Sequence, residues 1–213
     1  MSTPARDAYA CGADVAVELV TSDQVSAAWD EPSVLPGMSV GELAAHLARS
    51  VLQVEWYLDG PLDQGASPVT AEGYYADLSG TSDMSSSLNT GVRARSAQTA
   101  SPGVTALVEQ LVGTRERLRG RLGREPADRR LTVRHQGRTL LLDEYLRTRC
   151  VEFAVHTEDL ALSLRSDVRA PSQTVAAAVE VLVGAARLRH GDGEVLHALT
   201  RRERDTTDAL RVL

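Results

Sequence analysis

The chain has 213 residues, of which 43% are apolar and only 4% aromatic, so we expect an aliphatic core in one domain, with or without an appendage. The formal net charge is −6 at pH 7, and no run of basic residues alternates with aromatic ones, which argues against a nucleic-acid surface. No apolar stretch reaches the length of a membrane span, and the N-terminus lacks the apolar segment of a signal peptide. We therefore expect a cytoplasmic protein.

The two cysteines, Cys11 and Cys150, are too few for a disulfide framework. We interpret Cys150 as a packed thiol, because two residues on a helix lie about 200° apart and this places it away from Glu152. All 23 basic residues are arginine, and the chain has neither lysine nor isoleucine. This codon bias indicates a gene from a GC-rich genome.

The first predicted helix covers residues 13–29, where apolar residues recur at near-helical spacing until Asp30-Glu31-Pro32. The second covers residues 39–58, and Ser39 with Glu42 three positions later predicts a capping box at its start. His46 borders the apolar stripe of this second helix. The stripe consists of Leu43, Leu47, Val51, Val54 and Leu58.

The segment from 60 to 101 is rich in Ser, Thr, Gly and Asp, with helical character only around 88–100. Its composition fits a disordered connection equally well, and we interpret it as a candidate lid over a site. Further helices are predicted at 102–122, 143–164 and 172–190, followed by a short final helix. A short β-hairpin is predicted on either side of Gln136-Gly137-Arg138.

Together these elements predict a mainly α fold. The four helices at 13–29, 39–58, 102–122 and 143–164 indicate an antiparallel four-helix bundle. We expect residues 1–165 to form this metal-binding bundle and residues 166–213 to form a helical extension packed on it.

Three residues point to a metal site. Glu152 and His156 are four apart in a largely apolar segment, so a helix presents both on one face, and His46 could supply a third ligand from a facing helix. Three protein ligands with an open position are typical of a catalytic metal site. Taken singly, a histidine beside an apolar stripe is more often structural, and a Glu/His pair at this spacing is more often a surface pair. A buried Glu152, however, needs a compensating partner such as a cation.

Two neighbours could support the site. Asp159 lies three residues after His156 and is placed either to orient its imidazole or to remain a solvated carboxylate. Arg149 is placed either to bind a substrate anion or to form a surface ion pair. His135 is expected to be exposed in the hairpin. No nucleotide-binding or nucleophile motif is present, so no catalytic residue is assigned.

Two blocks, Trp29 to Arg49 with its Leu-Pro-Gly-Met-Ser-Val-Gly run and Glu152-Phe-Ala-Val-His-Thr-Glu-Asp-Leu160, resemble the N-terminal family of mycothiol-dependent maleylpyruvate isomerase, within the DinB-like superfamily of bundle metalloenzymes. The resemblance covers about residues 10 to 165. It implies a divalent metal, usually zinc, held by His46, Glu152 and His156, with mycothiol bound at the open position as thiolate. Mycothiol would agree with an actinobacterial source.

The chain departs from the isomerase itself after Leu164, where the sequence predicts helices instead of the α/β domain that contributes an arginine to isomerisation; Met38 also replaces an aromatic residue. We therefore expect an S-transferase-type reaction between a small thiol and a small electrophile. The alternatives are a non-catalytic or stress-related metal-binding bundle, a thiol-dependent isomerase, and a hydrolase that uses metal-activated water. The sequence does not constrain the oligomeric state.

Overall fold

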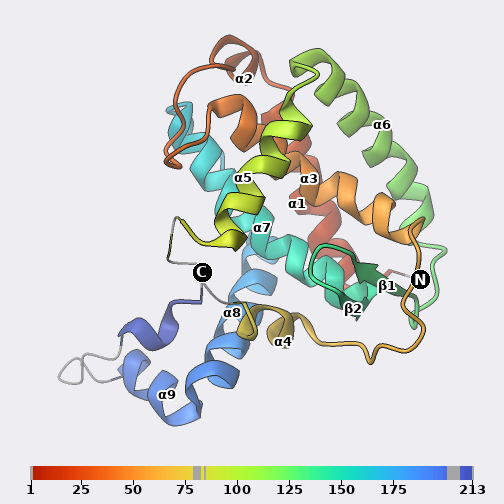
Figure 1. Cartoon of the computed structure of the whole chain (residues 1–213), viewed down its shortest axis with the longest axis vertical. Coiled ribbons are helices and arrows are strands. Elements are labelled where there is room, and N and C mark those ends of the chain that lie inside the picture. The colour runs from red at the N-terminus through yellow and green to blue at the C-terminus, as the bar shows by residue number, and fades with distance from the viewer. Residues whose placement is uncertain (1, 79–82, 84, 201–206, 213) are drawn as a thin grey trace.

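The computed structural model describes residues 2–78, 83, 85–200 and 207–212. In this part of the chain, nine α-helices and one short 3-10 helix accompany a single two-stranded hairpin (Figure 1). The predicted mainly α class with a small β-hairpin is therefore confirmed. Within the same residues, no helix combines the length and apolar character that a membrane crossing requires.

The first predicted helix was wrong in its extent. α1 (Pro4–Val20) starts nine residues earlier, because the side chain of Thr3 accepts a hydrogen bond from the backbone of Arg6 and proline suits the first helical position. The helix ends at Val20, and the Ser22 side chain then caps a separate short helix, α2 (Asp23–Ala27). The expected single helix over 13–29 is thus two helices.

The other long helices lie close to their predicted positions. α3 (Val40–Leu58) begins with the predicted capping box, in which Ser39 and Glu42 each accept from the other's backbone N–H. α6 (Val104–Leu122) and α7 (Leu142–Ser163) follow the predicted periodicity. The helices α1, α3, α6 and α7 pack against one another and enclose much of the apolar core.

The hairpin joins β1 (Arg130–Val133) to β2 (Arg138–Leu141) as an antiparallel pair in which Leu131 faces Leu140. Both leucines are buried, which fixes the face that packs on the helices. The turn requires a left-handed residue, and Gly137 supplies it with φ of +64°. Strand β2 leads directly into α7 and so helps to position the helix that carries Glu152 and His156.

The segment between α3 and α6 contains two helices. α4 (Ala71–Ala76) is short and packs on the C-terminal part of the chain, whereas α5 (Ser87–Ala100) lies along α3 and confirms the helical character predicted for 88–100. Residues 79–82 and 84 of the predicted lid lie outside the described residues.

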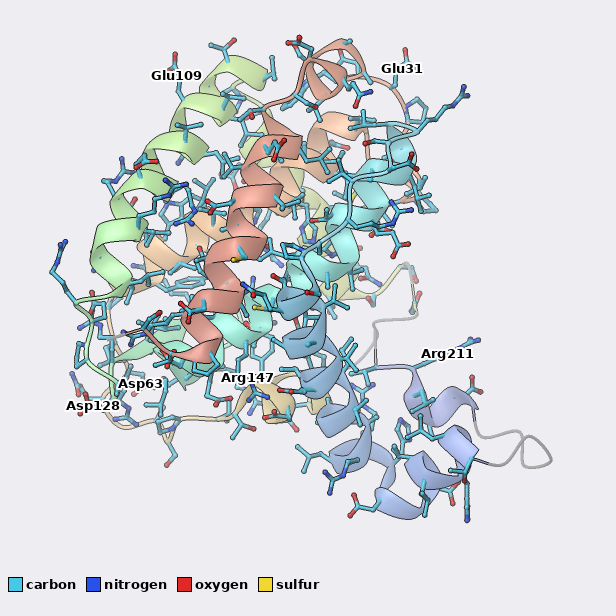
Figure 2. All side chains as sticks on the ribbon, turned by 180° about the vertical axis from the view of Figure 1, so that it is seen from behind. Glu31, Asp63, Glu109, Asp128, Arg147 and Arg211 are labelled. Carbon is cyan, nitrogen blue, oxygen red and sulfur yellow. The ribbon has the colours of Figure 1, made fainter. Side chains whose placement is uncertain are left out.

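The C-terminal region is helical, as expected: α8 (Ser172–His190), α9 (Asp192–Thr200) and η1 (Thr207–Leu210). Figure 2 shows α1, α7 and α8 side by side. Their close approach depends on Gly12, where an added Cβ would lie 2.8 Å from both Phe153 and Thr174. The division into domains at residues 165 and 166 stays a prediction.

Candidate metal centre

Helices α3 and α7 bring His46, Glu152 and His156 together, although about a hundred residues separate the first from the other two. The Nε2 atoms of His46 and His156 lie 3.5 and 3.6 Å, respectively, from Oε2 of Glu152. The imidazole rings meet edge to face, with centroids 4.4 Å apart. One potential ligand atom from each side chain lies within 4.8 Å of those from the other two, and all three side chains are partly buried.

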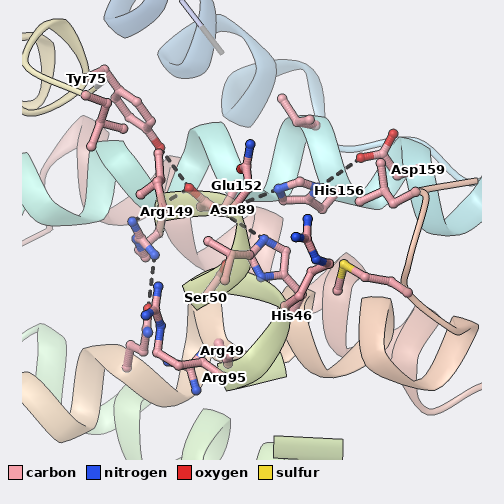
Figure 3. A pocket seen from close by; sticks show the side chains of 18 of the residues that line it. His46, Arg49, Ser50, Tyr75, Asn89, Arg95, Arg149, Glu152, His156 and Asp159 are labelled. Carbon is pink, nitrogen blue, oxygen red and sulfur yellow. Dashed lines mark hydrogen bonds and ion pairs between the residues drawn. The ribbon is translucent and has the colours of Figure 1, made fainter. Parts of the chain in front are cut away.

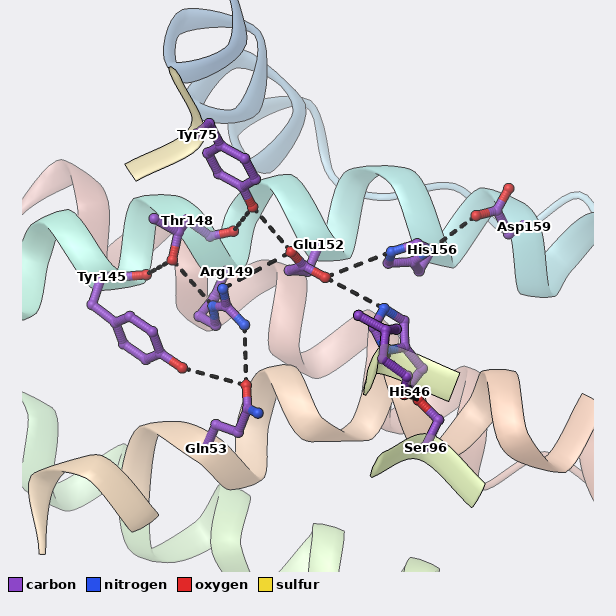
Figure 4. A network of polar contacts seen from close by, with 11 residues as sticks. His46, Gln53, Tyr75, Ser96, Tyr145, Thr148, Arg149, Glu152, His156 and Asp159 are labelled. Carbon is purple, nitrogen blue, oxygen red and sulfur yellow. Dashed lines mark hydrogen bonds and ion pairs between the residues drawn. The ribbon is translucent and has the colours of Figure 1, made fainter. Parts of the chain in front are cut away.

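The outer nitrogen of each imidazole has a hydrogen-bond partner that fixes the tautomer. The Ser96 hydroxyl donates to the Val92 carbonyl at 2.9 Å, so its oxygen can only accept from Nδ1–H of His46, 3.3 Å away. Asp159 Oδ2 lies 2.9 Å from Nδ1 of His156, and a carboxylate is only an acceptor. Both Nε2 atoms therefore point their lone pairs at Glu152 when the rings are neutral (Figure 4).

The electrostatic state of the three side chains favours a cation between them. Burial lowers the pKa of His46, and the adjacent His156 lowers it further, so this ring is neutral at pH 7. Burial acts to raise the pKa of Glu152, but the positive charge of Arg149 acts against this effect, and the pKa lies well below its usual range. A carboxylate anion thus faces two imidazole nitrogens, and a divalent metal ion stabilises such a donor set.

The other carboxylate oxygen of Glu152 is held by groups behind the site. The Tyr75 hydroxyl lies 3.0 Å from Oε1 and 3.1 Å from the Thr148 carbonyl. Arg149 approaches the same oxygen at 3.9 Å. These contacts leave Oε2 directed toward the two imidazoles (Figure 4).

Arg149 is buried, so the expectation of a surface ion pair was wrong for this residue. Its guanidinium donates to Oε1 of Gln53 and to Oγ1 of Thr148, each at 3.2 Å, and lies 4.7 Å from the centre of the Tyr145 ring. The same guanidinium lines the pocket in front of the metal ligands. Its other predicted role, contact with a substrate anion, stays a prediction.

A pocket of about 500 Å³ lies against the three candidate ligands (Figure 3). Its walls come mainly from α3, α5 and α7, and Asp159 also lines it. The predicted lid segment contributes Tyr74, Tyr75, Leu78, Leu88, Asn89, Val92, Arg93 and Arg95. The segment therefore does border the candidate site.

Three polar residues of the site escaped the sequence interpretation: Tyr75, Ser96 and Gln53. Gln53 carried a usable signal, because it is a polar residue on the buried face of α3, seven positions after His46. Tyr75 belongs to the Tyr74-Tyr75 pair in a chain with few aromatics. Ser96 had no signal, since its role depends on how α5 lies on α3.

The remaining candidates lie elsewhere. Cys150 is fully buried, as expected for a packed thiol, and burial raises its pKa to about 12. Cys11 is also a free thiol. His135 is exposed in the hairpin, as predicted, and its Nδ1 lies 3.1 Å from the Tyr57 hydroxyl, apart from the metal cluster.

We compared the chain with models of known protein families. Residues 13–161 match the family described as the mycothiol maleylpyruvate isomerase N-terminal domain. The chain belongs to this family. The match spans both α3 and α7 and thus includes all three candidate ligands, as the sequence resemblance predicted. No curated protein and no solved structure matches the chain significantly.

Proposed function

We propose that this protein is a metal-dependent enzyme that activates a low-molecular-weight thiol, with mycothiol as cosubstrate, for attack on a small electrophile. Its bundle would be DinB-like, and its reaction would be of the S-transferase type. The observation that carries this proposal is the convergence of two imidazole lone pairs and one carboxylate oxygen beside a pocket of about 500 Å³.

His46, Glu152 and His156 would hold the ion, and zinc is the first choice because it accepts nitrogen and carboxylate ligands in sites with three protein ligands. The same donors also suit nickel, iron or manganese. When bound there, a divalent cation lowers the pKa of a thiol that reaches it, so that the thiol reacts as thiolate at neutral pH.

The chain's own residues have distinct tasks in this proposal. Ser96 and Asp159 orient the two imidazoles, while Tyr75 and Arg149 orient the carboxylate. The pocket walls hold the electrophile so that its carbon faces the sulfur. A sulfur–carbon bond then forms. Either a leaving group departs with the electrons of its bond to that carbon, or the π bond of an activated double bond breaks and the neighbouring atom takes up a proton. The chain's thiols do not replace the cosubstrate in this scheme, because Cys150 is buried and protonated and Cys11 lies outside the pocket.

The proposal favours transfer over isomerisation. Isomerisation in the family's named member uses an arginine from an α/β domain, whereas the described C-terminal residues of this chain form α8, α9 and η1. A non-catalytic metal-binding role predicts the same ligands without thiol-dependent turnover. A hydrolase predicts turnover without thiol.

A cobalt-substituted sample distinguishes these possibilities. We expect mycothiol to produce the intense charge-transfer absorption of cobalt–thiolate ligation in the wild-type protein and not in His46→Ala. Conjugation of a panel of electrophiles should then require both the ion and the thiol. An unchanged spectrum on addition of mycothiol would contradict the proposal, and so would equal turnover without thiol.

A further inference from the structure

The pocket beside the candidate ligands carries more positive than negative charge. Among the described residues, four arginines and two carboxylates line it. The whole chain has a formal net charge of −6, so this local excess runs against the overall balance. A divalent ion at the three ligands would increase the excess, and a confined positive region attracts anions. The charged lining residues are Arg49, Arg93, Arg95, Arg149, Glu152 and Asp159.

Both carboxylates already have partners. Asp159 accepts from His156, and Glu152 faces the two histidines with Arg149 behind it. Neither is therefore available to neutralise the arginines on the α3 and α5 side of the pocket. The charge of those arginines is therefore not compensated by these two carboxylates.

Arg49 and Arg95 are the arginines without a local counter-charge. Within the described chain, no ion pair joins either guanidinium to a carboxylate. Among the described residues, Arg49 contacts the neutral groups Thr99 Oγ1 at 2.9 Å and the Trp56 ring at 5.5 Å. Burial lowers the pKa of Arg49, and the charges of Arg95 and Arg149 lower it further, although a guanidinium stays protonated at neutral pH. Two partly buried, uncompensated cations are costly unless a ligand pairs with them.

Their positions place this charge next to the candidate ligands. Arg49 follows His46 by three residues on α3, about one helical turn. Arg95 precedes Ser96, the residue that accepts from His46. Arg95 also lines an adjoining pocket of about 330 Å³ and so borders both pockets.

Apolar side chains form a large part of the remaining wall, beside polar residues such as Ser50, Asn89 and Gln136, and this mixture restricts the kind of anion that fits. A small organic acid could pack its body on these side chains and direct its carboxylate to the arginines, whose planar fork matches a carboxylate in geometry. An inorganic anion would leave the apolar wall unused. The apolar lining residues are Leu35, Met38, Leu78, Leu88, Val92 and Val155.

We infer that Arg49 and Arg95 form a subsite for the carboxylate of a small organic acid whose apolar body lies in the pocket beside His46, Glu152 and His156. We infer the binding of the acid from the charge and shape of the pocket alone. The further statement that the bound acid is the electrophile rests on the function proposed above. The bundle thus provides its own anion-recognition group on α3 and α5.

Calorimetric titration with cinnamate and with cinnamide, which has the same shape without the charge, tests the subsite. The protein is used as purified and again after removal of metal with a chelator. We expect wild-type protein to bind cinnamate at least about tenfold more tightly than cinnamide in both preparations, and added salt to reduce the difference. Arg49→Gln and Arg95→Gln should each remove most of the preference.

Arg138→Gln is the matched control, because Arg138 lines only the adjoining pocket and pairs with Asp77 at 2.8 Å. It should leave the preference unchanged. Arg49→Lys and Arg95→Lys, which keep the charge, should retain part of the preference and show that the Gln variants did not fail through misfolding. Inorganic phosphate should compete only weakly.

Equal binding of cinnamate and cinnamide would overturn the inference. So would a preference for cinnamate that is lost in Arg138→Gln but kept in Arg49→Gln and Arg95→Gln. A preference that requires metal and is the same in all the arginine variants would also overturn it. Thiol-dependent turnover of neutral electrophiles alongside equal binding would refute the subsite and leave the proposed function intact. An arginine-dependent preference in a protein that binds no metal even when zinc is supplied would support the subsite and refute the proposed function.

Discussion

Two buried charged clusters of this molecule differ in how their charge is compensated. At the start of α7, Arg6 from α1 is buried and pairs with Asp143 at 2.8 Å. Its guanidinium also donates to the carbonyls of Leu122 at 2.7 Å and Glu125 at 3.0 Å. The acceptors come from the start of α7, from the end of α6 and from the loop that follows it. The cluster joins α1, the end of α6 and the start of α7.

About two and a half turns along α7, the second cluster has the opposite character. His46, His156 and Glu152 direct three electron-pair donors at one another, and Arg49 lacks a carboxylate partner within the described residues. A buried charge that stabilises the fold is paired with opposite charges and hydrogen-bond acceptors of the same chain. Buried polar groups that bind a ligand are paired only when the ligand is bound. The following predictions test this contrast, in decreasing order of expected effect.

Zinc binding at the second cluster should cause the largest change in the stability of the folded protein. At a zinc concentration of a thousand times the dissociation constant, linkage predicts about 4 kcal/mol of added stability. For a chain of this size we expect a rise of about 10 °C in melting temperature. Glu152→Gln should abolish the rise in a calorimetric scan. Glu55→Gln, a carboxylate on α3 that pairs with Arg117, should keep it. A rise that persists in Glu152→Gln would contradict the contrast.

Loss of Arg6 should affect only the fold. Arg6→Met leaves Asp143 and three backbone carbonyls without their donor, and we expect the free energy of unfolding to fall by roughly 3 kcal/mol. Denaturant titration measures this change. The control Arg119→Met removes a largely exposed arginine that pairs with Asp14 and should change stability by less than about 1 kcal/mol. Metal affinity should be the same in both variants; a clear loss of it in Arg6→Met would show that the clusters are coupled.

Asp159 should matter through His156 alone. Asp159→Asn weakens the hydrogen bond that orients this imidazole, and we expect metal affinity to fall about 10- to 100-fold. Competition with a chromophoric chelator gives the dissociation constant. Glu158→Gln makes the same charge change at an exposed neighbouring position and should leave the affinity within about twofold. If both variants lost the same metal affinity, Asp159 would act only through its negative charge and not through its hydrogen bond to His156.

The smallest effect is expected at Ser96. Ser96→Ala removes a neutral hydrogen bond to His46, worth about 1 kcal/mol, so the metal affinity should fall about fivefold. The same competition assay applies, with Ser101→Ala at the exposed end of α5 as the control. If Ser96→Ala weakened binding more than Asp159→Asn, the larger contribution assigned to the carboxylate partner would be wrong.

The sequence predicted the parts of the fold that local chemistry determines. The Ser39/Glu42 capping box, the apolar spacing of α6 and α7 and the Gly137 turn all act over a few residues, and each was found where it was expected. The start of α1 was missed because its buried face carries Arg6 and Gly12, which do not form an apolar pattern. Thr3-Pro4 was the available signal for it.

For the site, the sequence indicated the three candidate ligands through spacing on α7 and the family resemblance, and the structure brings them together. It could not show the groups that arrive from other elements. Tyr75 comes from α4 and Ser96 from α5, and their contacts depend on packing across segments with no shared periodicity. Arg149 was named as a neighbour of the site, but the sequence could not show that it is buried and in contact with Gln53 and Tyr145.

The most direct test of the account is the metal content of the purified protein. We predict one divalent ion per chain in the wild type after exposure to zinc and dialysis, measured by mass spectrometry of the elements. His46→Ala and His156→Ala should each retain much less than one ion while keeping the wild-type circular dichroism spectrum. Stoichiometric metal in both variants, or none in the folded wild type, would contradict the proposal that these residues form a metal centre.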